Sequence, residues 1–286
     1  MPDLIDLVRA ELATPVDPRA AAMASAIAAE YPGSARAVLF YGSCLRESEL
    51  DGLMLDFYLI VSDYSDAYPK RWMAAANRLI PPNVFPFQHD GLIAKYAVLS
   101  EADFDRLNGA ETRNVSVWAR FAQPSRLVWA VDDTARDRAI AAVARAAPTL
   151  LAAAGRVNGE APLDWWRRAF SLTYSVELRA ERTSRAQSVV DADAERYARF
   201  SAPAIAAIPA DVRSGGWARR RLEGKALSIA RLAKASLTYA GGIDYLAWKI
   251  NRHAGTKIEI KPWQRRWPLV AALTLVPHLM KSGAIR

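Results

Sequence analysis

Residues 35–62 read ARAVLFYGSCLRESELDGLMLDFYLIVS, and this stretch decides the fold expected for the chain. Two apolar runs within it, 35–41 and 53–62, have the length and the aromatic and β-branched composition of strands. A glycine–serine pair ends the first run, and the second run is apolar apart from Asp56. Because a carboxylate inside such a strand costs free energy unless it is paired or binds a metal, Asp56 is the first candidate functional residue.

The turn between the two strands has the chemistry of a phosphate-binding loop. Backbone N–H groups and the hydroxyl of Gly42-Ser43 can face a phosphate, since glycine permits a close approach. A helix that followed the turn would direct its positive end at the same anion. The carboxylate of Asp56 could then hold Mg²⁺ against these phosphates, and Arg46, just past the turn, is a further phosphate ligand on its position alone.

The rest of the chain changes from mixed to helical. We expect further strands at 84–87 and 92–99, around the turn His89-Asp90-Gly91. Apolar periodicity predicts helices over the remaining ranges: 17–31, 70–79, 101–108, 111–122, 134–154, 163–181, 191–206, 217–240 and 243–252. The expected fold class is α+β, with a small mixed sheet in a domain over 1–130, a helical domain over 131–212 and a basic helical segment over 213–286.

Composition excludes several kinds of chemistry. The 286 residues are 52% hydrophobic and 24% charged, as in globular proteins. Cys44 is the only cysteine, which rules out a disulfide framework and a thiolate-rich zinc site. Three widely spaced histidines leave little material for a histidine metal centre or a serine–histidine triad. Any catalysis must therefore use carboxylates, hydroxyls and cations.

Positive charge gathers in the last quarter of the chain. Residues 213–286 hold 15 Lys and Arg against 3 Asp and Glu, whereas the preceding residues carry a small net negative charge. This asymmetry predicts an anionic partner, or a solvated basic face. Within 217–240 one helix face is apolar: Leu222, Ala226, Ile229, Ala230, Ala233 and Leu237. The apolar segment 267–280, with tryptophans and cations at its edge, is typical either of a membrane-interface segment or of a buried terminal helix.

Four segments carry a family resemblance, in this order: YGSCLRESELDGLMLDFYLIVSD (41–63), GLIAKYAVLSEADF (91–104), VWARFAQPSRLVW (117–129) and SLTYSVELRAE (171–181). The strand, Gly-Ser turn and strand with an acid resemble the nucleotidyltransferase superfamily typified by DNA polymerase β. The four segments together resemble the mitochondrial-type phosphatidate cytidylyltransferases. The chain departs from the first pattern at Met54, where most superfamily members carry a second acid. Residues that could complete the metal site are Glu47, Glu49, Asp51, Asp63 and Asp90.

The resemblance implies a polymerase β-like nucleotidyltransferase domain and transfer of CMP from CTP to phosphatidic acid with Mg²⁺. It implies catalytic roles for Asp56 and Lys95, with Asp56 as the metal ligand. The implied nucleotide-binding residues are Tyr41, Gly42, Ser43 and Arg120, and Arg46 joins them on its position alone. The implied acceptor-binding residues are Tyr174, Ser175 and Arg179. The motifs around the later residues differ from the family pattern at Ala119, Gln123 and Val176-Glu177.

A diacylglycerol-bearing acceptor places the enzyme at an anionic membrane surface. Residues 1–16 lack the basic start and apolar run of a secretory signal, and no apolar stretch reaches spanning length. We therefore expect a cytoplasmic protein held peripherally on the inner membrane, with no nucleic-acid partner. Two alternatives stay open: a nucleotidyltransferase with a soluble acceptor, and a catalytically inactive nucleotidyltransferase fold that binds nucleic acid through its basic helices.

Overall fold

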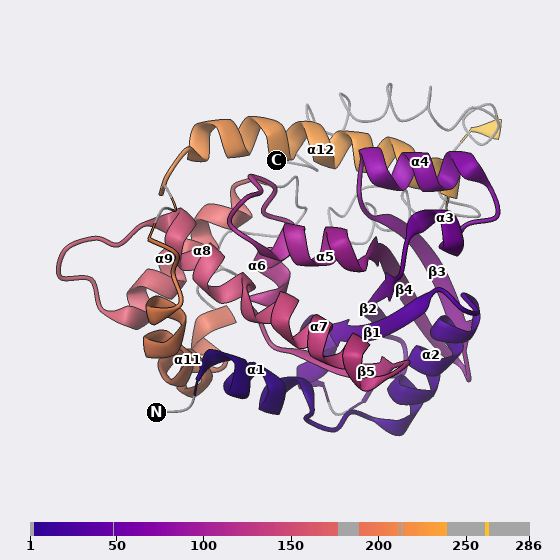
Figure 1. The fold of residues 1–286 in the computed structure, drawn as a ribbon, viewed down its shortest axis with the longest axis horizontal. Coiled ribbons are helices and arrows are strands. Elements are labelled where there is room, and N and C mark those ends of the chain that lie inside the picture. The colour runs from indigo at the N-terminus through magenta and orange to yellow at the C-terminus, as the bar shows by residue number, and fades with distance from the viewer. Residues whose placement is uncertain are drawn as a thin grey trace.

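A five-stranded mixed sheet with helices on both faces forms the centre of the protein (Figure 1). The structure is a computed structural model that describes residues 3–47, 49–176, 189–210, 212, 214–238 and 261–262. The strands are β1 (Ala35–Tyr41), β2 (Met54–Val61), β3 (Asn83–His89), β4 (Leu92–Ser100) and β5 (Ser125–Ala130). The α+β class and the mixed sheet predicted from the sequence are confirmed.

The strand order is β3-β4-β2-β1-β5. β2 pairs in parallel with β4, and every other pairing in the sheet is antiparallel. The β5 strand was not expected from the sequence. Its residues SRLVWA stand out only as part of a family motif, yet they pair with β1 from Ala37 to Tyr41, with Tyr41 opposite Ser125. Six residues are too few for alternation alone to reveal a strand at the edge of a sheet.

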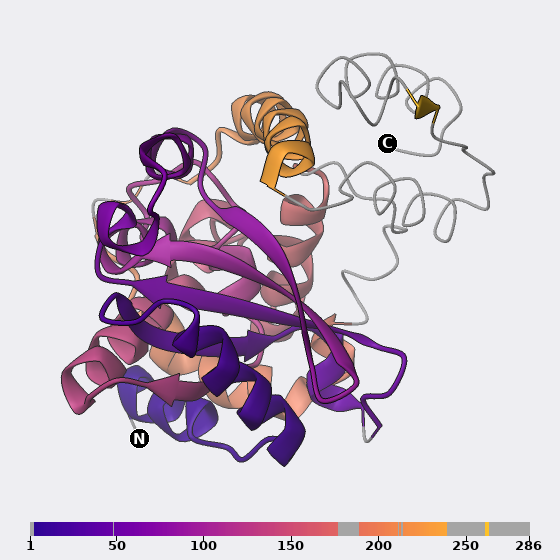
Figure 2. The same cartoon turned by 90° about the vertical axis from the view of Figure 1, so that its right-hand side faces the viewer.

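Alternate residues of the central strands enter two separate cores. On β2, Phe57 and Leu59 belong to one hydrophobic cluster, which α2 (Pro18–Ala29) covers. Tyr58 and Ile60 belong to the other cluster. In Figure 2, α2 lies in front of the sheet and the pink helices of the middle of the chain lie behind it. Burial on both faces explains why β2 is almost continuously apolar.

The second core is built from the N-terminal helix and the helices of the middle of the chain. Their bounds are α1 (Leu4–Leu12), α5 (Glu101–Asn108), α6 (Trp118–Phe121), α7 (Asp133–Ala144), α8 (Ala146–Ala154), α9 (Pro162–Tyr174) and α11 (Ala194–Ala206). Side chains from α8, α9 and α11 share this hydrophobic cluster with residues of the sheet. Two short elements, α3 (Tyr64–Ala67) and α4 (Arg71–Leu79), connect β2 to β3.

The helices predicted over 134–154 and 111–122 are wrong in extent. The range 134–154 forms two helices that meet at Arg145, because Pro148 has no N–H for the helical bond and its ring crowds the preceding turn. The range 111–122 is helical only over α6. Before it, Thr112 accepts a hydrogen bond from the backbone N–H of Asn114, and Asn114 accepts one from that of Ser116. Such side-chain bonds compete with a helical backbone.

The basic helix α12 (Trp217–Thr238) exposes its apolar face to solvent, the reverse of the orientation that its hydrophobic pattern predicts. Leu222 is 74% exposed and Ile229 36% exposed, so the apolar face points outward. The inward face carries cations, and Arg220 donates hydrogen bonds to the carbonyl oxygens of Thr112 and Arg113. In both views α12 runs along the top of the molecule, and it contacts β3 (Figures 1 and 2). Backbone carbonyls bind the inward cations of this helix, and Trp217 at its start packs against the second core.

Several expectations lie outside the described residues. These are Arg179, the helix at 243–252 and the apolar segment 267–280. The helix predicted over 163–181 is too long, since α9 ends at Tyr174 with Ser175 as its C-cap. Among the helices that the structure describes, none is both long enough and apolar enough to cross a bilayer.

Candidate active site

Three of the predicted site residues form one row across the sheet. Tyr41 on β1 lies opposite Asp56 on β2, and Asp56 lies opposite Lys95 on β4. Residues paired directly across strands direct their side chains to the same face. The phenol of Tyr41, the carboxylate of Asp56 and the ammonium of Lys95 are therefore neighbours, although Tyr41 and Lys95 are 54 positions apart in the sequence.

The Asp56 carboxylate lies between a cation and the glycine turn. Nζ of Lys95 is 2.8 Å from Oδ1 of Asp56, an ion pair in which both side chains are half-buried. A Cβ atom built on Gly42 would lie 3.3 Å from Oδ2 of Asp56. The carboxylate thus lies directly against the glycine turn. Gly42 has φ 98° and ψ −168°, a backbone conformation that only glycine adopts readily.

The α-helix anticipated after this turn is absent. Ser43–Arg46 forms a single turn of 3-10 helix, η1, and the chain then turns again before β2. So short an element has almost no dipole to direct at an anion. Ser43 and Arg46 are both exposed in η1, and neither of them lines the pocket described below.

The donor set at Asp56 fits a magnesium ion that binds through one carboxylate. Oδ1 of Asp56 is buried and has no hydrogen-bond partner, since the Lys95 ammonium lies outside hydrogen-bonding geometry. Mg²⁺ is commonly held by one or two carboxylates together with substrate phosphates and water. Within the described part of the chain, no three His, Cys, Asp or Glu side chains form a group that could hold a metal. Of the described residues, Asp56 is therefore the one that could serve as the protein ligand, with water or a bound phosphate supplying the other oxygens.

Three of the acids considered for a second ligand are used elsewhere. Asp63 caps α3 and pairs with Arg78 at 2.5 Å. Asp51 pairs with Arg19 at 2.9 Å, and Asp90 lies beside its neighbour His89. Each of these carboxylates has a structural partner of its own.

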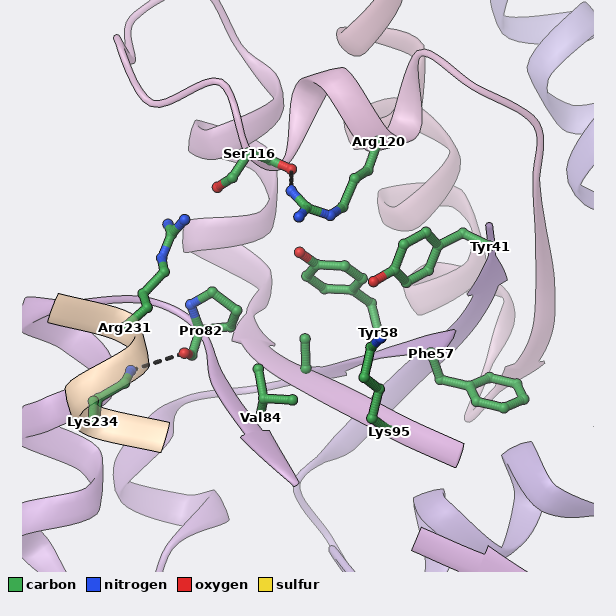
Figure 3. A pocket seen from close by; sticks show the side chains of 11 residues that line it. Tyr41, Phe57, Tyr58, Pro82, Val84, Lys95, Ser116, Arg120, Arg231 and Lys234 are labelled. Carbon is green, nitrogen blue, oxygen red and sulfur yellow. Dashed lines mark hydrogen bonds between the residues drawn. The ribbon is translucent and has the colours of Figure 1, made fainter. Parts of the chain in front are cut away.

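A cationic pocket of about 160 Å³ opens on the same face of the sheet (Figure 3). It is lined by side chains from β1, β2, β4, α6 and α12: Tyr41, Tyr58, Lys95, Arg120, Arg231 and Lys234. None of the described residues that line it is acidic. Lys95 belongs both to this pocket and to the ion pair with Asp56, so the pocket and the glycine turn form one continuous site.

Backbone carbonyls position three of the pocket cations. Arg120 donates a hydrogen bond through Nη1 to the carbonyl oxygen of Ser116. Nε of Arg231 lies 2.8 Å from the carbonyl oxygen of Pro81. Lys234 donates to the carbonyl oxygens of the residues on either side of Pro81, at 2.8 Å to Pro82. Loop 80–82 therefore fixes the end of α12 that enters the pocket.

Burial changes the protonation of two pocket residues. It lowers the pKa of Lys234 to about 7, and the neighbouring Arg231 charge contributes to the decrease. Burial also raises the pKa of the Tyr41 phenol well above its ordinary value, and the Asp56 carboxylate adds to the rise. Tyr41 is therefore a neutral hydrogen-bond donor near pH 7 and has no capacity as a general base.

The structure brings together five of the predicted site residues: Tyr41, Gly42, Asp56, Lys95 and Arg120. Tyr174 ends α9 and packs against the helical core. Ser175 is exposed and donates its hydroxyl hydrogen to the Leu172 carbonyl oxygen at 2.7 Å. Neither Tyr174 nor Ser175 lines the cationic pocket.

Arg231 and Lys234 line the pocket but were not predicted as site residues, because in the sequence they stand out only as members of the basic segment 213–286. The signal was present in the chain: Arg220, Gly224, Arg231 and Lys234 recur at helical spacing on the face opposite Leu222. Gly224 lies against Val176, and a Cβ atom on Gly224 would come within 2.3 Å of Cγ1 of Val176. A small residue at this position is therefore a second feature in the sequence that distinguishes the inward side of α12.

No protein-family model and no curated protein matches the chain. The function has to be inferred from the arrangement of its own residues.

Proposed function

We propose that the protein is a Mg²⁺-dependent nucleotidyltransferase that joins CMP from CTP to phosphatidic acid, giving CDP-diacylglycerol and pyrophosphate. The observation that carries the proposal is the contact of the Asp56 carboxylate with the Gly42 turn. The β1–turn–β2 unit, with its acid in the second strand, supports a polymerase β-like nucleotidyltransferase fold. The four quoted family motifs support the choice of substrates.

The lining of the pocket favours an acceptor that is already an anion. A hydroxyl acceptor has to lose a proton, yet no histidine or carboxylate is among the described residues that line the pocket. A phosphate monoester is largely dianionic near neutral pH, with a second pKa of about 6, so it needs no general base. The lining thus supports phosphatidic acid over a sugar or protein hydroxyl.

The transfer step is then an electrostatic problem. An oxygen of the acceptor phosphate bonds to the α-phosphorus of CTP, and the bond from that phosphorus to the β-phosphate oxygen breaks, which releases pyrophosphate. Mg²⁺ supplies charge stabilisation to the phosphates when it is bound. Lys95 and Arg120 offset the repulsion between acceptor and nucleotide, and the Gly42 backbone allows the triphosphate to approach Asp56.

The outward face of α12 supports a lipid partner. Leu222, Ala226 and Ile229 are exposed along the helix, and the cations Arg221 and Lys225 lie beside them on the exposed side. An apolar strip with cationic flanks is typical of helices that lie in an anionic membrane interface. We therefore infer peripheral attachment, at the cytoplasmic face of the inner membrane as expected from the lipid acceptor and the N-terminal sequence.

Substitution of Leu222 and Ile229 by aspartate is expected to weaken binding to phosphatidic-acid vesicles at least ~10-fold, because burying each side chain contributes about 1.5–3 kcal/mol. Co-sedimentation of the full chain with the vesicles measures this. Val157→Asp removes a side chain that is 53% exposed in the 155–161 loop and should bind like the wild type. Equal sedimentation of the double variant and the wild type would show that α12 does not contact the lipid.

The activity itself is tested with CTP labelled at the α-phosphate, Mg²⁺ and vesicles that contain phosphatidic acid. We expect the label to enter the lipid extract, and chelation of Mg²⁺ to prevent this. CTP labelled at the γ-phosphate should leave all its label in the aqueous phase as pyrophosphate. Absence of lipid label from α-labelled CTP, or salt-sensitive binding to nucleic acid without transfer, contradicts the proposal.

A further inference from the structure

The cationic pocket is too small to hold the nucleotide. Ligand pockets for drug-sized molecules measure about 300–1,000 Å³, whereas a cavity of about 150 Å³ takes a molecule the size of benzene. At about 160 Å³, this pocket accommodates a single phosphate-sized group. Gly42 and Asp56 are not part of its lining, so the turn and the pocket offer two adjoining places for phosphate.

The donors in the pocket converge on one space. In Figure 3 the guanidinium groups of Arg120 and Arg231 lie on either side of Ser116, and the Tyr58 hydroxyl points between them. Lys234 reaches the same pocket from the next turn of α12. Two planar guanidinium groups that face one space are suited to tetrahedral oxyanions, since each can present parallel N–H donors to two oxygens.

Positive charge gathers in the pocket, whose described lining includes four cations and no acid. Arg120, Arg231 and Lys234 line it together with Lys95, and Lys95 also forms an ion pair with Asp56, which lies outside the lining. Lys234 is 8% exposed, and its lowered pKa reflects burial beside a like charge. A bound dianion would offset this repulsion and favour the ammonium form of Lys234.

We infer that Arg120, Arg231 and Lys234 bind the phosphate group of the acceptor monoester, beside the nucleotide site at Gly42 and Asp56. The helix α12 then supplies acceptor recognition on its inward face and lipid contact on its outward face. Naming the anion as the acceptor rests on the proposed function, whereas anion binding in the pocket does not.

Titration calorimetry of the full chain with inorganic phosphate tests the site without any turnover. Arg231→Ala should weaken phosphate binding about 10–100-fold, because it removes a charge-assisted pair of hydrogen bonds. Arg136→Ala, which removes an exposed cation from α7, a helix that contributes no residue to the described lining, should leave phosphate binding unchanged. Affinity for CTP in the absence of acceptor should change less than threefold in both variants.

Sulfate provides a second measurement, because its charge does not change between pH 6 and pH 8.5. The groups that face Lys234 across the pocket are the guanidinium groups of Arg120 and Arg231, the ammonium of Lys95 and the two tyrosine hydroxyls. Lys234 itself has a pKa of about 7, so it loses its positive charge over this range. The wild-type affinity for sulfate should therefore fall about tenfold between pH 6 and pH 8.5. Lys234→Arg keeps its charge and should bind sulfate with little change over the same range.

The outcomes separate the two proposals. Unchanged phosphate binding in Arg231→Ala, or a fall in CTP affinity that parallels the fall in phosphate affinity, overturns the acceptor site. If Arg231→Ala does not fold, a sulfate affinity of Lys234→Arg that falls with pH as in the wild type overturns it as well. A short-chain phosphatidic acid should displace phosphate, and failure to do so assigns the pocket to free phosphate. Phosphate binding that depends on Arg231, without nucleotidyl transfer, supports the pocket while the proposed function fails.

Discussion

Asp56→Asn is expected to reduce CMP transfer about a thousandfold while the fold stays intact. In the proposed mechanism the carboxylate is the protein ligand of Mg²⁺, and a bound metal contributes several kcal/mol to stabilising the transition state. Each 1.36 kcal/mol corresponds to a factor of ten in rate. Oδ1 of Asp56 accepts no hydrogen bond, and Lys95 is exposed enough to hydrate, so loss of the charge costs little stability. Lipid-extracted label measures transfer, and circular dichroism on heating measures the fold.

Asp63→Asn is the matched control. Asp63 follows the other end of β2, where it caps α3 and pairs with Arg78, far along the strand from the glycine turn. An asparagine can still cap the helix, so both the melting temperature and the transfer rate should stay close to those of the wild type. Transfer by Asp56→Asn within tenfold of the wild-type rate would remove Asp56 from the reaction.

Gly42→Ala is expected to lower transfer about 10–100-fold. Alanine at φ 98° and ψ −168° is strained by about 1–3 kcal/mol. Its Cβ atom would also lie 3.3 Å from Oδ2 of Asp56, which forces the carboxylate or the turn to shift by a few tenths of an ångström. A misplacement of about 1 Å can cost a hundredfold in rate, so a smaller shift of the metal-binding group gives a loss within this range. Transfer rate and melting temperature are measured on the same preparation.

Gly52→Ala separates backbone strain from contact with the carboxylate. Gly52 lies in the same β1–β2 connection with φ 72°, but a Cβ atom there meets nothing within 4 Å. Both glycine variants should therefore have a lower melting temperature than the wild type, whereas the transfer rate of Gly52→Ala should stay within threefold of the wild-type rate. If the two variants lose activity equally, the effect belongs to the strained backbone, and the contact with Asp56 has no part in it.

Much of the first half of the fold could be predicted from the sequence. The apolar runs around the Gly-Ser turn form β1 and β2, and the turn at Asp90-Gly91 joins β3 and β4. A strand that is buried on both faces can be recognised in the sequence, because nearly all of its residues are apolar. Asp56 is the charged residue within such an apolar run, which is why a single sequence was enough to select it.

The remaining site residues depend on pairings that no local pattern records. Lys95 reaches Asp56 because β2 pairs in parallel with β4, across a connection that contains α3, α4 and β3. Arg120 reaches the pocket from α6, and its helix was predicted to be three times as long as it is. Side-chain hydrogen bonds to the backbone at 112–116 shortened that helix.

The sequence by itself determined the strands β1 to β4, the glycine turn and the half-buried acid, because each follows from which residues a strand or a turn tolerates. Only the tertiary structure decided which face of α12 points inward. Carbonyl groups at 80–82 and 112–113 accept hydrogen bonds from Arg220, Arg231 and Lys234. Those bonds turn the cations toward the sheet and leave Leu222 and Ile229 exposed, the reverse of what hydrophobic burial alone favours.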